Sequence, residues 1–106
     1  MLRLFEAIAV LSLAAQPVLA EQPGNARMSE LTYLVRQDCG SCHGMTLKGG
    51  LGKPLQPTNL KQWDSGQLTQ IILNGVPGTP MPPWRDLLSE EDARWIADAL
   101  KQGRIK

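Results

Sequence analysis

The sequence predicts an all-α domain with three main helices and long glycine- and proline-rich loops. Three segments place apolar residues at the spacing of one helical face, and no segment alternates apolar and polar residues over the length of a strand. The 10 glycines and 8 prolines lie mostly between these segments, where they interrupt regular structure. A chain of 106 residues has room for one small domain.

The first 20 residues have the pattern of a secretory signal peptide. Arg3 precedes an apolar run at residues 7–15, and Val18-Leu19-Ala20 gives the small-residue pattern of a cleavage site. The apolar run is shorter than the about 20 residues that a membrane-spanning helix needs; an uncleaved N-terminal anchor is the alternative interpretation. We therefore expect residues 1–20 to be a signal peptide cleaved after Ala20, and residues 21–106 to be an exported domain without stable membrane association.

The first main helix is predicted from about Arg27 to Cys39. Its three apolar residues fall on one helical face: Leu31, Leu34 and Val35. The segment from Cys39 to Gly44 contains two glycines, the second being Gly44 itself, and these are expected to end the helix. The stretch that follows, from Thr46 to Leu60, contains three glycines and two prolines and is expected to be a loop.

The second main helix is predicted to begin at Asp64 or Ser65, because either side chain can cap a helix N-terminus. Its buried face is expected to comprise Leu68, Ile71 and Ile72. Gly75 follows Asn74 and is expected to end the helix as a left-handed cap. Four prolines between Val76 and Trp84 then exclude a regular helix.

The third main helix has the clearest signals at both ends. Ser89 is expected to be its N-cap, the acidic residues 90–92 favour the positive end of the helix dipole, and Lys101 lies near the negative end. The expected buried stripe consists of Ala93, Ile96, Ala97 and Leu100.

Composition excludes several classes of protein. Eleven basic and ten acidic side chains give a net charge of +1, which offers no basic stripe for a nucleic acid. The length excludes a multidomain enzyme. Beyond the expected leader the chain has only three tryptophans and one tyrosine as aromatic residues. A small domain of this kind usually needs a disulfide, a metal or a cofactor to complete its core.

The segment Cys39-Gly40-Ser41-Cys42-His43 is a C-x-x-C-H motif, which is typical of covalent haem c attachment. The two thiols add across the vinyl groups of the porphyrin, and the next residue places an imidazole beneath the iron. One haem c would supply the missing core. The alternatives are a redox dithiol, which lacks a βαβ framework here, a plain disulfide, and a zinc site, for which these three residues are too few ligands.

His43 is the only histidine, and as a ligand its second ring nitrogen needs a hydrogen-bond acceptor. We expect that acceptor in the segment from Gly52 to Leu55, with the carbonyl of Pro54 as the first candidate. The alternative is that Pro54 only shapes the loop.

Met81 is the candidate for the second axial ligand of the iron. Of the four methionines, Met1 lies in the leader, Met28 begins the first helix, and Met45 follows His43 too closely to reach the other face of the ring. Prolines on both sides restrict the loop around Met81 and so lower the entropy lost on ligation. If Met81 were only an apolar plug, the iron would be open to carbon monoxide or nitric oxide.

The remaining candidates have two interpretations each. Trp63 either turns its indole N–H toward a haem propionate or belongs to the core, while Trp84 and Trp95 are expected to pack beneath the methionine loop and between helices. Four basic residues are expected to be solvated charges, with a place around an exposed haem edge as the alternative: Lys48, Lys53, Lys61 and Arg85.

Four motifs in order resemble the class I monohaem cytochromes c. They are CGSCH at 39–43, ILNG at 72–75, TPMPPW at 79–84 and LSEEDARWIADAL at 88–100. The resemblance implies the cytochrome c fold, in which N- and C-terminal helices cross at one haem edge. It also implies thioether bonds at Cys39 and Cys42 and axial ligation by His43 and Met81. Leu31, Leu34 and Val35 stand where the family usually has a glycine and a phenylalanine, so the resemblance leaves the helix crossing open.

The segments 33–52 and 75–84 are similar to the small periplasmic cytochromes associated with dissimilatory nitrite reductase in denitrifying bacteria. This similarity implies a periplasmic one-electron carrier rather than an enzyme, with nitrite reductase or an enzyme maturing its specialised haem as partner. The alternatives are a general respiratory electron carrier and a haem protein that binds ligands at an open iron. We expect a monomer, although exchange of the last helix between two chains would give a dimer.

The loop around Pro77, Gly78 and Pro80 carries almost no charge, with Gly49 and Gly50 as expected neighbours. We therefore expect a mostly apolar, transient docking patch for a redox partner.

Overall fold

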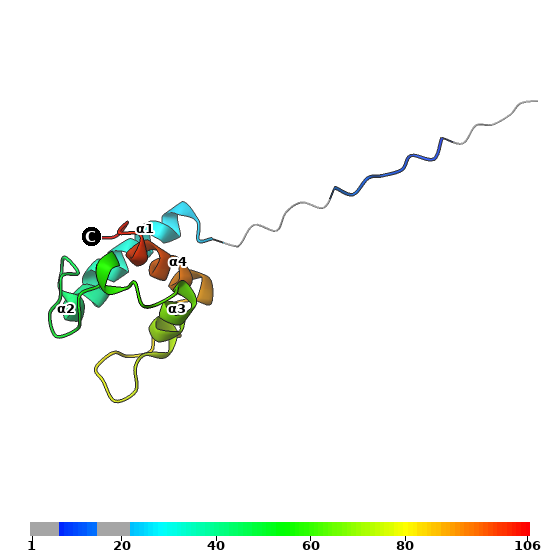
Figure 1. Cartoon of the computed structure of the whole chain (residues 1–106). Coiled ribbons are helices and arrows are strands. Elements are labelled where there is room, and N and C mark those ends of the chain that lie inside the picture. The colour runs from blue at the N-terminus through cyan, green and yellow to red at the C-terminus, as the bar shows by residue number, and fades with distance from the viewer. Residues whose placement is uncertain (1–6, 15–21) are drawn as a thin grey trace, which may run out of the picture.

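The computed structural model describes residues 7–14 and 22–106, and within these ranges it is helical without strands (Figure 1). The elements in order are α1 (Asn25–Leu34), the π-helical turn η1 (Val35–Cys39), α2 (Gly40–His43), the 3-10 turn η2 (Pro57–Asn59), α3 (Ser65–Asn74) and α4 (Glu90–Lys101). The all-α prediction is confirmed. No helix in these ranges has the length and apolar character to cross a bilayer. The expected cleavage after Ala20 lies outside the described residues.

The N-terminal helical path continues past the residue where the sequence predicted its end. Instead of stopping at Cys39 it passes through η1 and α2 to His43. The π turn is closed by the Gly40 N–H, which donates to the Val35 carbonyl five residues earlier. Gly44 ends the path with φ 90°, and a Cβ there would lie 2.6 Å from the Gly49 carbonyl oxygen. Of the two glycines expected to end the helix, Gly44 does so, whereas Gly40 is accommodated within the helix; the predicted last residue, Cys39, was therefore too early.

Helices α3 and α4 begin with the caps that the sequence predicted. The Asp64 carboxylate accepts a hydrogen bond from the Gln67 N–H, and the Gln67 side chain in turn accepts one from the Asp64 N–H. Ser89 and Asp92 form the same reciprocal pair at the start of α4. Gly75 ends α3, as expected, but with φ 68° and ψ −172° it lies outside the left-handed helical region that the sequence predicted.

The C-terminus of α4 turns back onto the core. Gly103 has φ 68°, and the Arg104 N–H donates to the Ala99 carbonyl at 2.9 Å, which forms a Schellman motif. This turn buries Ile105, of which 4% is exposed. The four residues expected to form the α4 stripe are all buried: Ala93, Ile96, Ala97 and Leu100.

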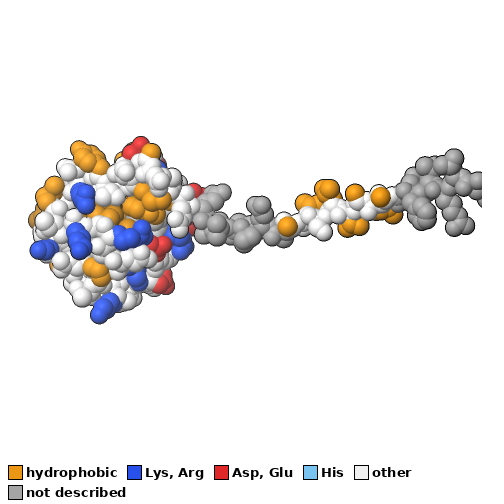
Figure 2. Space-filling model, turned by 90° about the horizontal axis from the view of Figure 1, so that it is seen from above, with side chains coloured by type: hydrophobic (Ala, Val, Ile, Leu, Met, Phe, Trp, Pro, Cys, Tyr) orange, Lys and Arg blue, Asp and Glu red, His pale blue; other side chains and the backbone are white. Residues whose placement is uncertain are grey.

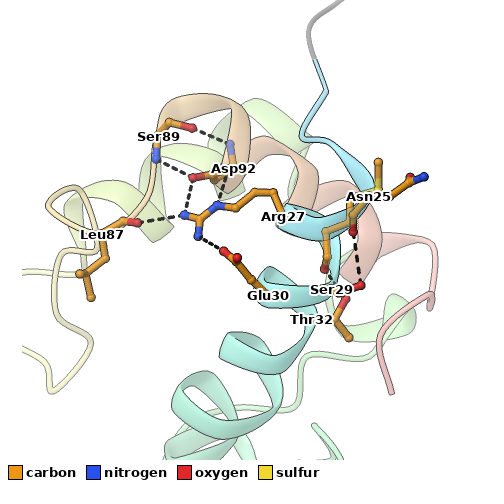
Figure 3. A network of polar contacts seen from close by, with 9 residues as sticks. Asn25, Arg27, Ser29, Glu30, Thr32, Leu87, Ser89 and Asp92 are labelled. Carbon is orange, nitrogen blue, oxygen red and sulfur yellow. Dashed lines mark hydrogen bonds and ion pairs between the residues drawn. The ribbon is translucent and has the colours of Figure 1, made fainter.

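A polar network joins α1 to the start of α4 and was not predicted from the sequence (Figure 3). The Arg27 guanidinium donates to both carboxylate oxygens of Asp92, at 2.8 and 3.4 Å, and to the Leu87 carbonyl oxygen at 3.3 Å. It also pairs with Glu30 at 2.9 Å. Below this network, Leu31 and Val35 belong to the same buried core as the α4 stripe. The crossing that the sequence left open is therefore held by aliphatic packing and one shared ion pair.

Candidate functional site

The two cysteines and the histidine of the C-x-x-C-H motif lie on one continuous helical path. Cys39 is the last residue of η1, whereas Cys42 and His43 belong to α2. Because residues three apart share a helix face, Cys39 and Cys42 present their thiols to the same side. Both are free thiols and half-buried. Burial and the neighbouring Asp38 charge raise the pKa of the Cys39 thiol to about 11, so this thiol is neutral at neutral pH.

The imidazole of His43 is oriented by a backbone carbonyl, but not by the one we expected. Nδ1 lies 2.7 Å from the Lys53 carbonyl oxygen, so the prediction of Pro54 was wrong by one residue. The Pro54 ring instead lies against Gly49. Since a carbonyl only accepts, Nδ1 carries the proton, and Nε2 keeps its lone pair free for a metal.

The loop after α2 folds back beneath this histidine. The Gly49 N–H donates to the His43 carbonyl and the Gly52 N–H to the Cys42 carbonyl, both at 2.8 Å. Gly52 lies so close that a Cβ would stand 2.7 Å from His43 Nδ1 and Cε1. A Cβ on Gly50 would stand 2.7 Å from the Cys42 carbonyl oxygen. The sequence placed these glycines in a loop but did not predict that Gly52 approaches the histidine ring, because the path of the loop sets that contact.

Met81 lies half-buried in the loop that follows α3. The Val76 N–H donates to the Met81 carbonyl at 3.2 Å, and the Met81 N–H donates to the Thr79 hydroxyl at 3.3 Å. A Cβ on Gly75 would stand 2.7 Å from the Met81 carbonyl oxygen, so the loop returns directly onto the end of α3. Of the other described methionines, Met45 lies against Gly40 and is 57% exposed, whereas Met28 lies half-buried in α1.

Several apolar side chains pack against the core yet keep part of their surface exposed, as contact with a bound haem would require: Leu34, Leu55, Ile71, Ile72 and Trp84. The available donors are two thiols, an imidazole with a free Nε2 and a thioether. These are the groups that attach and ligate haem c. The residues present therefore suit this cofactor in both their polarity and their donor chemistry.

The other candidate residues lie at the periphery. Trp63 is 38% exposed, and its carbonyl accepts a hydrogen bond from Lys101. Trp95 packs against the core and is covered by the Arg104 guanidinium, 5.5 Å from the ring centroid. Lys48, Lys53, Lys61 and Arg85 are exposed, in agreement with solvated charges. Arg85 in addition donates to Asn74.

Comparison with known proteins places the chain among c-type cytochromes. The family model described as cytochrome c oxidase, cbb3-type, subunit III matches residues 26–98. The chain is 54% identical over 91 residues to cytochrome c55X of Paracoccus denitrificans, covering 86% of this chain and 88% of that protein. Among solved structures, c-type cytochrome NirC superposes with a TM-score of 0.77 at 48% identity, covering 78% of this chain and 98% of that chain.

A much larger protein contains a similar domain. The structure of dihydro-heme d1 dehydrogenase NirN in complex with DHE superposes with a TM-score of 0.62 at 34% identity. The match covers 66% of this chain but only 15% of that one. Together with the helical fold and the C-x-x-C-H site, these matches show that the chain belongs to the c-type cytochromes, in the group that includes the cytochromes c55X, and is an electron carrier with covalently bound haem c.

Proposed function

We propose that this chain is a periplasmic one-electron carrier of denitrification whose haem is bonded to Cys39 and Cys42 and ligated by His43 and Met81. The observation that carries the proposal is the hydrogen bond that orients the His43 imidazole. Its Nδ1 proton is engaged by the Lys53 carbonyl at 2.7 Å, which leaves Nε2 as a ligand beside two free thiols.

When bound, haem c supplies a one-electron iron couple. The protein contributes ligands that stay in place in both oxidation states. The Lys53 carbonyl fixes the His43 tautomer and ring orientation, while the loop hydrogen bonds fix the approach of Met81. A soft thioether favours the reduced iron and so raises the reduction potential.

We further propose that the redox partner is nitrite reductase or an enzyme that matures its specialised haem. Dihydro-heme d1 dehydrogenase NirN contains a domain like this one within its own chain. A separate chain that resembles this domain suits electron exchange with an enzyme that acts on haem d1 or its precursor. Two loops supply exposed apolar surface for docking: Val76, Pro77 and Pro80 after α3, and Met45 and Leu51 after α2. Both loops project from the helices (Figure 1).

The partner is tested in two arms, each followed by absorbance. In the first, the reduced protein is mixed with nitrite reductase and nitrite, and its reoxidation is measured. In the second, the oxidised protein is mixed with a dihydro-haem d1 dehydrogenase and its dihydro-haem substrate, and its reduction is measured. We expect rapid, saturable electron exchange in at least one arm. Equal rates with unrelated periplasmic redox enzymes would instead indicate a general respiratory carrier.

The compartment is tested on the protein produced from the full-length gene. We expect the haem-containing form in the periplasmic fraction, as a monomer, with its N-terminus at Glu21. Recovery of the intact N-terminus in the membrane fraction would instead support an uncleaved anchor.

A further inference from the structure

We propose that Asn74 and Arg85 are positioning residues that hold the Met81 loop closed and thereby set how readily the sixth position of the iron opens. This inference rests on the proposed ligation by Met81. It concerns two residues that touch neither the cysteines nor the histidine, and that lie at the two ends of the loop.

Two backbone hydrogen bonds tie the ends of the loop to α3. At its start, the Gly75 N–H donates to the Ile71 carbonyl at 2.8 Å. At its end, the Trp84 N–H donates to the Ile72 carbonyl at 3.1 Å. Both ends of the loop are therefore bonded to the last turn of α3. We call the place where these two ends meet, at Gly75 and Trp84, the neck of the loop.

The tip of the loop is shaped by local contacts. The Thr79 N–H donates to the Val76 carbonyl at 3.2 Å, and Gly78 has φ 79°, which together with Pro77 forms a type II turn. A Cβ on Gly78 would meet nothing within 4 Å. Met81 lies between this tip and the neck, with its carbonyl bonded to the Val76 N–H at 3.2 Å, so the neck contributes to where Met81 is held.

One pair of side chains closes this neck. Arg85 Nη2 donates to Asn74 Oδ1 at 2.7 Å, and Arg85 Nε approaches the same oxygen at 3.3 Å. Asn74 is itself oriented by its amide nitrogen, which donates to Gln70 Oε1 at 3.2 Å. Within residues 22–106, this pair is the one side-chain hydrogen bond that joins the end of α3 to the segment after the loop.

The expected consequence is kinetic. Movement of Met81 away from the iron requires the neck to widen, so loss of the closing contact favours the open state. The contact is exposed and charge-assisted, and we expect its loss to speed opening about fivefold, which corresponds to about 1 kcal/mol in activation free energy.

The test is the rate at which carbon monoxide binds to the reduced holoprotein, which is limited by departure of the native ligand. Asn74→Ala and Arg85→Ala should each accelerate binding about fivefold, and the double variant no further, because both remove the same contact. Arg85→Lys, which keeps the charge and one donor, should fall between wild type and Arg85→Ala. Arg94→Ala, which removes an exposed charge from α4, is the matched control and should bind at the wild-type rate.

Met81→Ala separates this inference from the ligation on which it rests. If Met81 is the ligand, this variant binds carbon monoxide fast, and adding Arg85→Ala changes nothing more. Wild-type rates in both neck variants beside a fast Met81→Ala would overturn the positioning role alone. A Met81→Ala variant as slow as wild type would overturn the ligation and the positioning role together.

Discussion

One hydrogen bond orients the imidazole of His43, and a neighbouring glycine leaves the space that the ring occupies. The Lys53 carbonyl fixes Nδ1, and the bare Cα of Gly52 leaves room for the ring edge. The sequence identified the histidine, because its place after Cys42 is a strong local signal. It missed the acceptor by one residue, since the direction of a carbonyl depends on the path of the whole loop.

Gly52→Ala tests the close approach of this loop to His43. A Cβ at 2.7 Å from Nδ1 and Cε1 has to displace the ring or the loop, and we expect a loss of about 1–3 kcal/mol in stability together with a lower fraction of chains that acquire haem. Haem absorbance per protein and the urea unfolding midpoint measure the two effects. Gly24→Ala is the control, because a Cβ there meets nothing within 4 Å. Equal haem content and stability in both variants would show that the approach is unimportant.

Met81→Ala tests the second proposed ligand. Loss of the thioether should lower the reduction potential and change the visible spectrum of the reduced protein, because a soft axial ligand favours ferrous iron. Potentiometric titration measures the shift. Met45→Ala and Met28→Ala are matched controls and should leave the potential unchanged, since Met45 lies against Gly40 and Met28 in α1. A shift in a control variant but not in Met81→Ala would reassign the ligand.

Helices α3 and α4 begin where short-range rules place them, because a capping box involves residues only three apart. The π turn at Val35–Cys39 had no such signal. Its extra width keeps Gly40 inside the helical path, and the helix end then falls at Gly44, where the returning loop leaves no space for a side chain. The ends of helices were thus predictable where interactions between residues close in sequence determine them, and not where tertiary contacts do.

The ion pair between α1 and α4 makes a prediction about pH. Hydrogen bonding to Arg27, assisted by the Ser89 N–H, holds the pKa of the Asp92 carboxyl below its ordinary value. A carboxyl with a lowered folded pKa adds stability that is complete above the unfolded pKa, about 4, and is lost as the pH falls through the folded pKa. Denaturant unfolding of the wild type should therefore lose stability as the pH falls below about 4.

Asp92→Asn removes the titrating group and is expected to flatten part of this acid dependence. Arg27→Met leaves the Asp92 carboxylate without its guanidinium, and we expect a cost of about 1–3 kcal/mol at neutral pH. Asp86→Asn is the control, since this exposed residue lies outside the network. If Asp92→Asn and Asp86→Asn reduce the pH slope equally, the ion pair does not hold the crossing.

Across the whole molecule, composition and one motif predicted the cofactor, whereas they did not predict the contacts between distant residues. A scarcity of aromatic residues with one C-x-x-C-H motif was enough to expect a cofactor in the core. The Arg27–Asp92 contact joins residues 65 positions apart, and no pattern in either helix identifies the pair. The proposed docking surface lies between these cases, because its loop around Pro77, Gly78 and Pro80 was predicted as nearly uncharged and is exposed.

Partner association should depend only weakly on salt. The chain has a net charge of +1, and Lys and Arg side chains are dispersed between apolar patches on the face shown in Figure 2 rather than gathered in a stripe. Charge steering gives steep salt dependence only where one sign of charge is concentrated. We therefore expect the second-order rate of electron transfer to change by about threefold or less between low and physiological ionic strength, over which the screening length falls to about 8 Å.

Stopped-flow reoxidation at several salt concentrations measures this dependence. Leu51→Asp places a charge on an exposed apolar position of the loop after α2 and should slow association, whereas Gln102→Asp places the same charge beyond the end of α4 and should not. If transient electron transfer uses a small apolar patch, the loop variant alone loses rate at every ionic strength. A steep fall in the wild-type rate with salt, together with equal loss in both variants, would show that long-range charge and not the loop surface guides docking.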